Sequence, residues 1–358
     1  MAVQAAPSNV TGKADSATLD VLRALAVLYV LFSHVCKELI PPAAFGRFAI
    51  LTLGKVGVYF FFVHTSLVLL LSLQRRIAGK GRLPLFVSFM LRRVFRIYPL
   101  SVVVVATVHL LVALAVLNGP RPSIAMTSTN LLLVQNIFGQ DSLPGALWSL
   151  PFEVQMYLFL PWLFLLVERR LLNVARLLIV WGAWSIGVFA LAAAHLRYDL
   201  IRFVPCFLPG IMAYVLWTRP RRVPFFVLPI MLGVLGSVVP ILTGYGMRET
   251  LLSWPTCLML GLTLPFVTEV QSPVIRATAH TIAKYSYSIY LVHQPCAEYF
   301  LGSRTSWPIP LRLVAFTLAV VGLSYLGYHV IEAPGIRLGS RLAGPRSAAR
   351  RLPSPEAP

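Results

Sequence analysis

The sequence predicts an all-α fold: a polytopic membrane helix bundle of about ten transmembrane helices, with both termini in the cytoplasm. Three observations support this prediction. Of the 358 residues, 58% are hydrophobic and only 12% are charged, whereas soluble domains carry about 25% charged residues. The mean hydropathy is +0.77. Long apolar runs alternate with short basic loops, which is the pattern of a multi-pass membrane protein.

Ten apolar segments are long enough to cross a bilayer, for which a helix needs roughly 20 residues. In chain order they lie near residues 18–36, 50–73, 96–117, 146–167, 172–194, 200–217, 224–243, 250–268, 281–301 and 309–331. Pro and Gly residues interrupt several of these segments, so their ends are placed only to within a few residues. An even number of spans puts both termini on one side of the membrane.

The distribution of basic residues orients the bundle. A formal net charge of +19 would suit a nucleic-acid-binding protein, but the Lys and Arg residues gather in alternate short loops and near the C-terminus. Such loops face the cytoplasm by the positive-inside rule. We therefore expect membrane lipids and no nucleic acid among the partners.

The chain divides into three regions. Residues 1–17 are polar and lack the order of a cleaved signal peptide, so we expect a cytoplasmic N-terminus and a retained first span. Residues 18–334 form the transmembrane domain. Residues 335–358 are expected to form a basic, disordered cytoplasmic tail near anionic lipid headgroups. The four cysteines are scattered, which favours neither a disulfide framework nor a metal site.

The first span carries an arginine and a histidine in an apolar run, "LDVLRALAVLYVLFSHV" (residues 19–35). Arg23 and His34 are eleven residues apart, about three turns, so they share one helix face and stand roughly 16 Å apart along the axis. Titratable groups inside a membrane usually mark a functional path. The alternative is that Arg23 reaches the inner headgroups and His34 sits at the outer interface.

This arginine–ten residues–histidine pattern resembles the membrane-bound acyltransferase 3 family, the integral-membrane O-acyltransferases of surface glycans and related acceptors. Five further stretches resemble that family in the expected order: "KVGVYFFFV" (55–63), "FMLRRVFRIYP" (89–99), "LWSLPFEVQMYLFLP" (147–161), "YSYSIYLVHQP" (285–295) and "YHVIEAPGIRLGSRL" (328–342). The second span departs from the pattern. "HTSL" from His64 to Leu67 replaces the usual leucine–serine–glycine–phenylalanine, and Tyr59 stands where an aspartate is common.

The resemblance implies acyl transfer from an acyl-coenzyme A, most simply acetyl-CoA, with no metal. Such transfer needs a base for the acceptor hydroxyl and groups that stabilise oxyanion charge. His34 is the expected catalytic base, or it carries the acyl group itself. Arg23 and Glu153 complete the expected catalytic set.

Basic residues ahead of the third span are candidates for the coenzyme phosphates. Arg92 and Arg96 fall on one helix face with Arg93 beside them. A guanidinium can bond phosphate with two parallel hydrogen bonds. The alternative for all three is ordinary positive-inside topology.

The fourth span supplies Glu153 and, one turn on, Tyr157, just after Pro151. Glu153 would pair with Arg23 or a histidine, bind acceptor hydroxyls, or form a purely structural ion pair. Trp148 and Ser149 are expected at the cavity entrance, with interfacial anchoring as the alternative for Trp148.

The ninth span carries Tyr287, Tyr290 and His293 at intervals of three, a polar stripe that suits substrate binding or simple helix packing. The remaining histidines at 109, 195, 280 and 329 have no such context, and we interpret them as interfacial or satisfied core residues. Glu332 is expected to act as a structural cap before Pro334.

These observations favour a bacterial inner-membrane O-acyltransferase acting on a hydroxyl of an extracytoplasmic or lipid-linked saccharide. A transporter or flippase for a lipid-linked sugar or acyl carrier is the alternative, because it too would carry intramembrane Arg, His and Glu. A membrane sensor without chemistry has less support. The acceptor, the length of the acyl group and the oligomeric state stay open.

Overall fold

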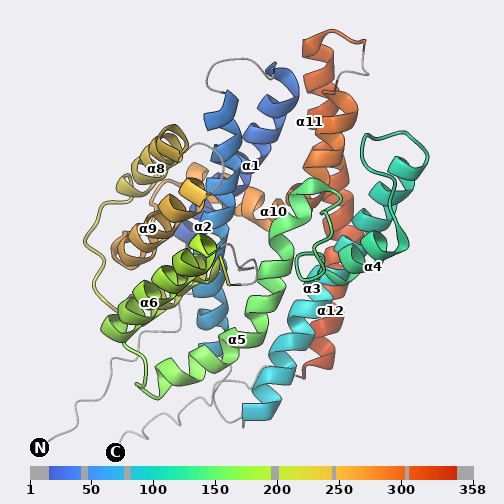
Figure 1. Ribbon diagram of the computed structural model, residues 1–358. Helices are drawn as coiled ribbons and strands as arrows, with labels where there is room; N and C mark the ends of the chain where they lie inside the picture. The colour runs from blue at the N-terminus through green and yellow to red at the C-terminus, as the bar shows by residue number, and fades with distance from the viewer. Residues whose placement is uncertain are drawn as a thin grey trace, which may run out of the picture.

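The computed structural model describes residues 16–41, 47–75, 82–194, 201–243, 247–302 and 306–344. These residues form a helix bundle and no β-strand, apart from one isolated bridge between Val223 and Val267 (Figure 1). The predicted all-α fold is therefore confirmed for the described part of the chain.

Each predicted apolar segment coincides with helix. The elements are α1 (Ala17–Leu39), α2 (Arg47–Gln74), α3 (Arg82–Ala113), α4 (Ile124–Leu132), η1 (Gly145–Ser149), α5 (Leu150–Glu168), α6 (Val174–Ala193), α7 (Val204–Leu216), α8 (Val227–Thr243), α9 (Met247–Thr263), η2 (Leu264–Phe266), α10 (Pro273–Phe300), α11 (Ile309–Leu326), η3 (Gly327–Glu332) and α12 (Ala333–Leu342).

Length and composition single out six helical stretches of the described chain as able to cross a membrane. They are Ala17–Leu39, Thr52–Gln74, Leu85–Ala113, Gly145–Glu168, Val174–Ala192 and Ile309–Leu342. Three other apolar helices are shorter, with windows at Val204–Leu216, Val227–Val238 and Leu252–Phe266. The bundle therefore has the character of a membrane protein, while the count of ten spans stays a prediction.

Helix α3 begins at Arg82 rather than near residue 96. The sequence placed the start at the first continuous apolar run, but Arg and Leu are both good helix formers and extend the helix through the basic stretch. Helix α4 was not predicted. Its N-cap Ser123 accepts a hydrogen bond from the Met126 amide.

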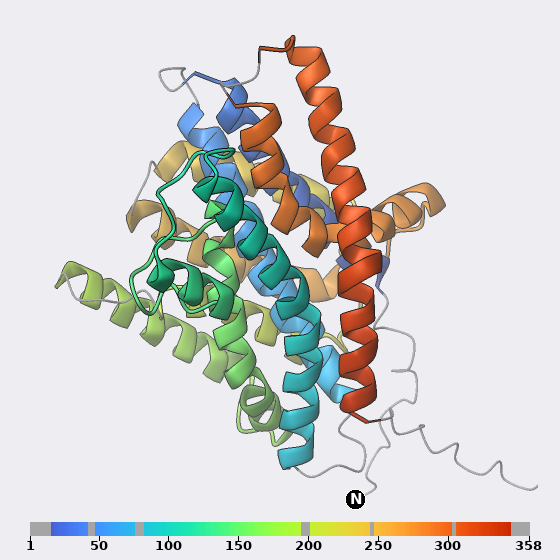
Figure 2. The same cartoon turned by 90° about the vertical axis from the view of Figure 1, so that its right-hand side faces the viewer.

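Helix α12 occupies part of the region expected to be a loose tail, and it runs alongside α3 (Figure 2). Close approach explains this, because a methyl group at Gly335 would lie 2.4 Å from the Phe95 carbonyl oxygen. Arg92 donates a 3.0 Å hydrogen bond to the Gly344 carbonyl oxygen, which ties the two segments further. The rest of that tail, and residues 1–15, lie outside the described residues.

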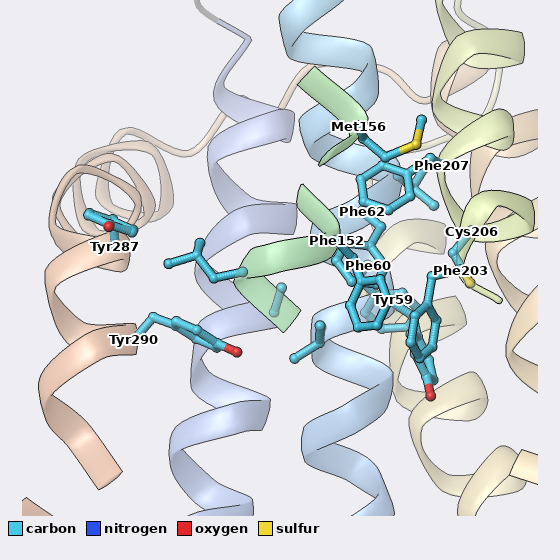
Figure 3. Close-up of a cluster of buried hydrophobic side chains, with 14 of the residues drawn as sticks. Tyr59, Phe60, Phe62, Phe152, Met156, Phe203, Cys206, Phe207, Tyr287 and Tyr290 are labelled. Atoms are coloured by element: carbon cyan, nitrogen blue, oxygen red, sulfur yellow. The ribbon is translucent and has the colours of Figure 1, made fainter. Parts of the chain in front are cut away.

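The core of the bundle is built around α2, which packs against α1 and α7, while α1 also packs against α10. Aromatic side chains from α2, α5 and the start of α7 fill the centre (Figure 3). The rings of Phe62 and Phe207 stack with centroids 4.4 Å apart, and Phe203 meets Phe152 edge to face at 4.7 Å. This packing holds α2 and α5 in fixed positions beside a polar cavity.

Candidate active site

A narrow cavity of about 90 Å³, here called the arginine cavity because Arg23, Arg93 and Arg96 line it, lies among α1, α2, α3, η1, α5 and α10. Eight of the predicted site residues line it: Arg23, Arg93, Arg96, Ser149, Glu153, Tyr157, Tyr287 and Tyr290. Figure 3 shows Tyr290 projecting from α10 toward α1. Residues from six separate elements thus converge on one polar space inside an apolar bundle.

Arg23 is fixed by α10. Its Nε donates a 2.6 Å hydrogen bond to the Ser286 hydroxyl, which in turn donates to the Ala283 carbonyl oxygen at 2.8 Å. Ser286 was not predicted as a site residue. The hydroxyl orients the guanidinium without neutralising it, so the positive charge remains available to the cavity.

Glu153 is held by Tyr157 one turn further along α5. The Tyr157 hydroxyl donates a 2.5 Å hydrogen bond to Glu153 Oε1, and the Thr65 hydroxyl approaches the same oxygen at 3.5 Å. Glu153 lies in the first turn of α5, where the helix dipole favours a negative charge. The direct partner of Glu153 is therefore Tyr157, and Arg23 lines the same cavity.

The three arginines of α3 that were predicted to bind phosphate have different surroundings. Arg93 and Arg96 line the cavity, and the Arg93 guanidinium also lies 5.8 Å from the centre of the Phe89 ring. Arg92 instead contacts Gly344, as described above, and is absent from the lining. The helical periodicity of the sequence placed Arg92 and Arg96 together, but the observed cavity takes Arg96 with Arg93.

Glu332 differs from the predicted structural cap. It ends a π-helical turn, and its side chain makes no cap hydrogen bond to α12. It is fully buried, accepts a 3.0 Å hydrogen bond from the Ser288 hydroxyl, and lies 4.0 Å from Arg96 Nη2. The Glu332 carboxylate is therefore linked to the cavity through Arg96, which lines it.

His34 and His293 face each other with ring centroids 4.8 Å apart and planes at 81°. His34 Nδ1 lies 2.9 Å from the Val30 carbonyl oxygen, and His293 Nδ1 lies 3.1 Å from that of Ile289. A carbonyl oxygen only accepts, so each Nδ1 carries a proton, and in the neutral imidazole the Nε2 then keeps a lone pair. His293 Nε2 is buried without a partner.

The histidine pair adjoins the cavity but does not line it. Tyr290 connects the two, because its ring lies 5.8 Å from that of His293 and also lines the cavity. The Tyr290 hydroxyl is 2.7 Å from Ser149 Oγ and also donates to the Ala146 carbonyl oxygen. Trp148 lies away from this cavity, packed against Phe203 and Phe152.

His64 lines the cavity and was singled out by the sequence only as a departure from the family pattern. Its side chain is 4% exposed, and Nδ1 is buried without a hydrogen-bond partner. Thr65 and Ser286 also line the cavity. Both lie in stretches that were compared with the family pattern, but neither was predicted as a site residue. An unsatisfied imidazole nitrogen in a polar cavity is a natural contact for a bound ligand.

Three of the remaining histidines have local partners. His109 contacts Thr127 Oγ1 and the Leu143 carbonyl oxygen, His280 pairs with Asp20, and His329 contacts the Tyr285 hydroxyl. His195 lies outside the described residues. Within the described ranges, no three His, Cys, Asp or Glu side chains gather as metal ligands do.

Comparison with known proteins gives one match. The family model of acyltransferase 3, described as an acyltransferase domain, matches residues 16–329. The matched range contains all of the cavity-lining residues. No curated protein and no solved structure matches the chain.

Proposed function

Because the chain belongs to the acyltransferase 3 family and is an acyltransferase, we propose that it moves an acyl group, most simply acetyl, from cytoplasmic acyl-CoA to a saccharide hydroxyl. The saccharide would be extracytoplasmic or lipid-linked. One observation carries the proposal. The paired histidines, with the buried Nε2 of His293 left without a partner, adjoin a cavity lined by three arginines.

His34 is the proposed base. With Nδ1 donating to the Val30 carbonyl oxygen, the imidazole is held in the tautomer whose Nε2 accepts a proton. His34 Nε2 would take the proton of the acceptor hydroxyl as the oxygen attacks the acyl carbonyl. The C–S bond of the thioester then breaks, and the imidazolium returns the proton to the departing coenzyme A sulfur, which leaves as the free thiol. His293 packs edge to face against the ring and keeps it in place. Transfer of the acyl group through His34 itself is the other form of the same proposal.

Arg93 and Arg96 are the proposed holders of the donor's phosphates. Two guanidinium groups on one wall suit phosphate oxygens, and the narrow cavity suits a thin, extended arm. The buried His64 Nδ1 offers such an arm a polar contact that the protein leaves unfilled. The bound coenzyme supplies an activated acyl group as a thioester.

Arg23 and Glu153 have complementary proposed roles. The Arg23 guanidinium, oriented by Ser286, stabilises negative charge that develops on the acyl carbonyl oxygen. Glu153, held by Tyr157, balances the arginine charges and keeps the cavity polar. Ser149, Tyr157, Tyr287 and Tyr290 offer hydroxyl groups to the substrates. Tyr290 stands between the cavity and His293. The proposal therefore includes a rotation of the Tyr290 side chain that opens the cavity toward the histidine pair.

The proposed setting is the bacterial cytoplasmic membrane, crossed ten times by residues 18–334, with both termini in the cytoplasm. The positive-inside distribution of Lys and Arg supports this orientation. It directs Arg93 and Arg96 toward the donor's compartment and His34 toward the opposite leaflet. The cavity then provides part of a path across the membrane.

The test uses purified protein in lipid nanodiscs, with acetyl-CoA as donor and the free thiol of coenzyme A as readout. His34→Ala should lower the rate about 10²- to 10⁴-fold, the usual contribution of general acid–base catalysis. His280→Ala is the matched control, since that side chain is 71% exposed, pairs with Asp20 and does not line the cavity. Added imidazole should partly restore the His34→Ala rate.

Thiol release by His34→Ala at the wild-type rate would remove His34 from the chemistry. No thiol release by the wild-type protein, with transport of a lipid-linked sugar instead, would replace the acyltransfer proposal by the transporter hypothesis.

A further inference from the structure

A cluster of aromatic and basic side chains lies on the surface of the bundle, where α10 packs against α11 and η3. Its members are Lys284 and Tyr285 of α10, Tyr325 of α11, and Tyr328 and His329 of η3. We call it the tyrosine cluster. None of its members lines the arginine cavity, so the proposed acyl transfer gives them no role.

The rings of the tyrosine cluster pack against one another. The centroid of the Tyr285 ring lies 5.1 Å from that of Tyr328 and 6.2 Å from that of Tyr325. The His329 ring lies 4.3 Å from the Tyr325 ring, and its Nε2 is 3.1 Å from the Tyr285 hydroxyl. These contacts between the helices fix the cluster before any ligand arrives, which lowers the entropic cost of binding.

Lys284 places its ammonium group over this cluster. The Nζ atom lies 4.9 Å from the centre of the Tyr285 ring and 5.0 Å from that of the Tyr328 ring. The faces of the rings attract the cation, but an ammonium also has three N–H donors. No carboxylate and no other oxygen in the described part of the chain accepts a hydrogen bond from Lys284.

Two hydroxyl groups beside this ammonium also lack a hydrogen-bond partner. They belong to Tyr325 and Tyr328, and neither bonds to another of the described residues, whereas the Tyr285 hydroxyl contacts His329. The cluster thus contains one cation, two unfilled hydroxyl donors and no carboxylate. An anion with several acceptor oxygens, such as a phosphate group, matches this set of donors.

The depth of the tyrosine cluster indicates where that phosphate comes from. Lys284 and Tyr328 each lie about one turn from the cytoplasmic ends of the predicted spans 281–301 and 309–331. Tyrosine is enriched at this level of a membrane, and a lysine near the end of a span extends toward the headgroups. Tyr325 is 54% exposed, so a lipid could reach the cluster from the side.

We propose that the tyrosine cluster binds the phosphate of an anionic glycerophospholipid in the cytoplasmic leaflet. Lys284 is the cation of this site, and Tyr325 and Tyr328 are its hydroxyl donors. The proposal uses the membrane orientation given above, but it does not depend on acyl transfer. A protein that released no thiol from acetyl-CoA would still be expected to bind this lipid.

Native mass spectrometry of the full-length protein in detergent measures the affinity for the first bound lipid. The probes are phosphatidylglycerol, which is anionic, and phosphatidylcholine with the same acyl chains, which has no net charge. The wild-type protein should bind phosphatidylglycerol about tenfold more tightly, because a hydrogen bond to a charged group is stronger than one between neutral groups. Lys284→Gln should remove this preference, whereas Lys284→Arg should retain it. Tyr328→Phe keeps the ring, removes the hydroxyl, and should weaken binding of phosphatidylglycerol about threefold or more.

Arg276→Gln is the matched control, because Arg276 is an exposed cation of the same helix, about two turns before Lys284 and outside the cluster. This variant should keep the preference for phosphatidylglycerol. Thermal unfolding midpoints equal to that of the wild type establish that the variants fold.

Equal binding of the two lipids by the wild-type protein would overturn the proposal. An equal loss in Arg276→Gln and Lys284→Gln would do so as well, because it would indicate general attraction to a basic surface. Wild-type affinity in both Tyr328→Phe and Lys284→Gln would mean that the lipid binds elsewhere. Displacement of phosphatidylglycerol by millimolar inorganic phosphate would make free phosphate the ligand and would refute the lipid.

Discussion

Arg92, Arg93 and Arg96 share about one turn of α3, yet they have different surroundings. Arg93 and Arg96 line the arginine cavity, whereas Arg92 contacts the Gly344 carbonyl oxygen beyond α12. Three arginines that look alike in the sequence therefore differ in what their side chains contact. This difference allows donor binding to be tested against a control from the same turn of helix.

We expect Arg93→Gln and Arg96→Gln each to raise the KM for acetyl-CoA about tenfold or more, because a charge-assisted hydrogen bond to phosphate contributes about 1.5–3 kcal/mol. Arg92→Gln should change it less than about threefold, since Arg92 contacts the Gly344 carbonyl oxygen and does not line the cavity. Steady-state kinetics of thiol release in nanodiscs measures all three. Equal effects at the three positions would point to general electrostatic attraction instead.

At the residue scale, the sequence allowed the polar residues of single helices to be found but not their partners. Arg23 and Glu153 were identified because charge inside an apolar run is costly, and both line the cavity. The contact of His34 with His293, and that of Arg23 with Ser286, join residues more than 250 positions apart. Helical periodicity carries no information about which faces of distant helices meet.

At the element scale, the apolar runs predicted where helices occur, while packing decided where some of them begin. Helix α3 starts in a basic stretch because it lies against α12 as well as the apolar core. A second pocket, lined in part by residues 135–143 of the loop after α4, was not foreseen because that loop owes its shape to side-chain contacts such as that of Asn130 with Leu143. Trp148 was expected at a cavity entrance, and it lines this other pocket.

The position of α1 depends on close contact with α2 at Gly57. A methyl group at that position would lie 2.6 Å from the Ala26 carbonyl oxygen and 3.0 Å from Tyr29 Cβ. We expect Gly57→Val to lower the free energy of unfolding by about 1–3 kcal/mol, the usual cost of overpacking. It should also lower the rate of thiol release, because α1 carries both Arg23 and His34.

Gly187→Val is the control for this element, because no atom lies within 4 Å of the added carbon at that position of α6. Thermal unfolding in nanodiscs compares the two variants. If both behave as the wild type does, close contact between α1 and α2 does not determine the site.

At the scale of the whole molecule, one carboxylate joins the start of the described chain to two segments more than 200 residues further on. Glu269 accepts hydrogen bonds from Ser16 Oγ at 2.7 Å, from the Thr18 amide at 3.1 Å, and from Arg221. Ser16 is also the N-cap of α1. Glu269 thereby fixes the end of α1 from which Arg23 extends into the bundle, and it links that end to the segments before α8 and α10.

Stability should depend on pH through Glu269. Burial alone would raise the pKa of its carboxyl, but the hydrogen bonds from Ser16 and Thr18 and the charge of Arg221 lower it below the usual 4.5. A lowered folded-state pKa means that the ionised carboxylate stabilises the fold above the unfolded pKa, and that this contribution is lost as pH falls through the folded value. The group is about one-third exposed, so solvent screening keeps the effect modest.

We expect Glu269→Gln to lower the free energy of unfolding at pH 7 by about 1 kcal/mol, the typical net worth of a hydrogen bond. The difference from the wild type should shrink as pH falls below about 4.5, because the wild-type carboxyl then becomes protonated as well. Thermal unfolding midpoints of both proteins between pH 7 and pH 3 measure this convergence. A difference that stays constant over that range would mean that the contacts of Glu269 hold α1 through shape rather than charge, and Arg221→Gln should then leave the midpoint unchanged.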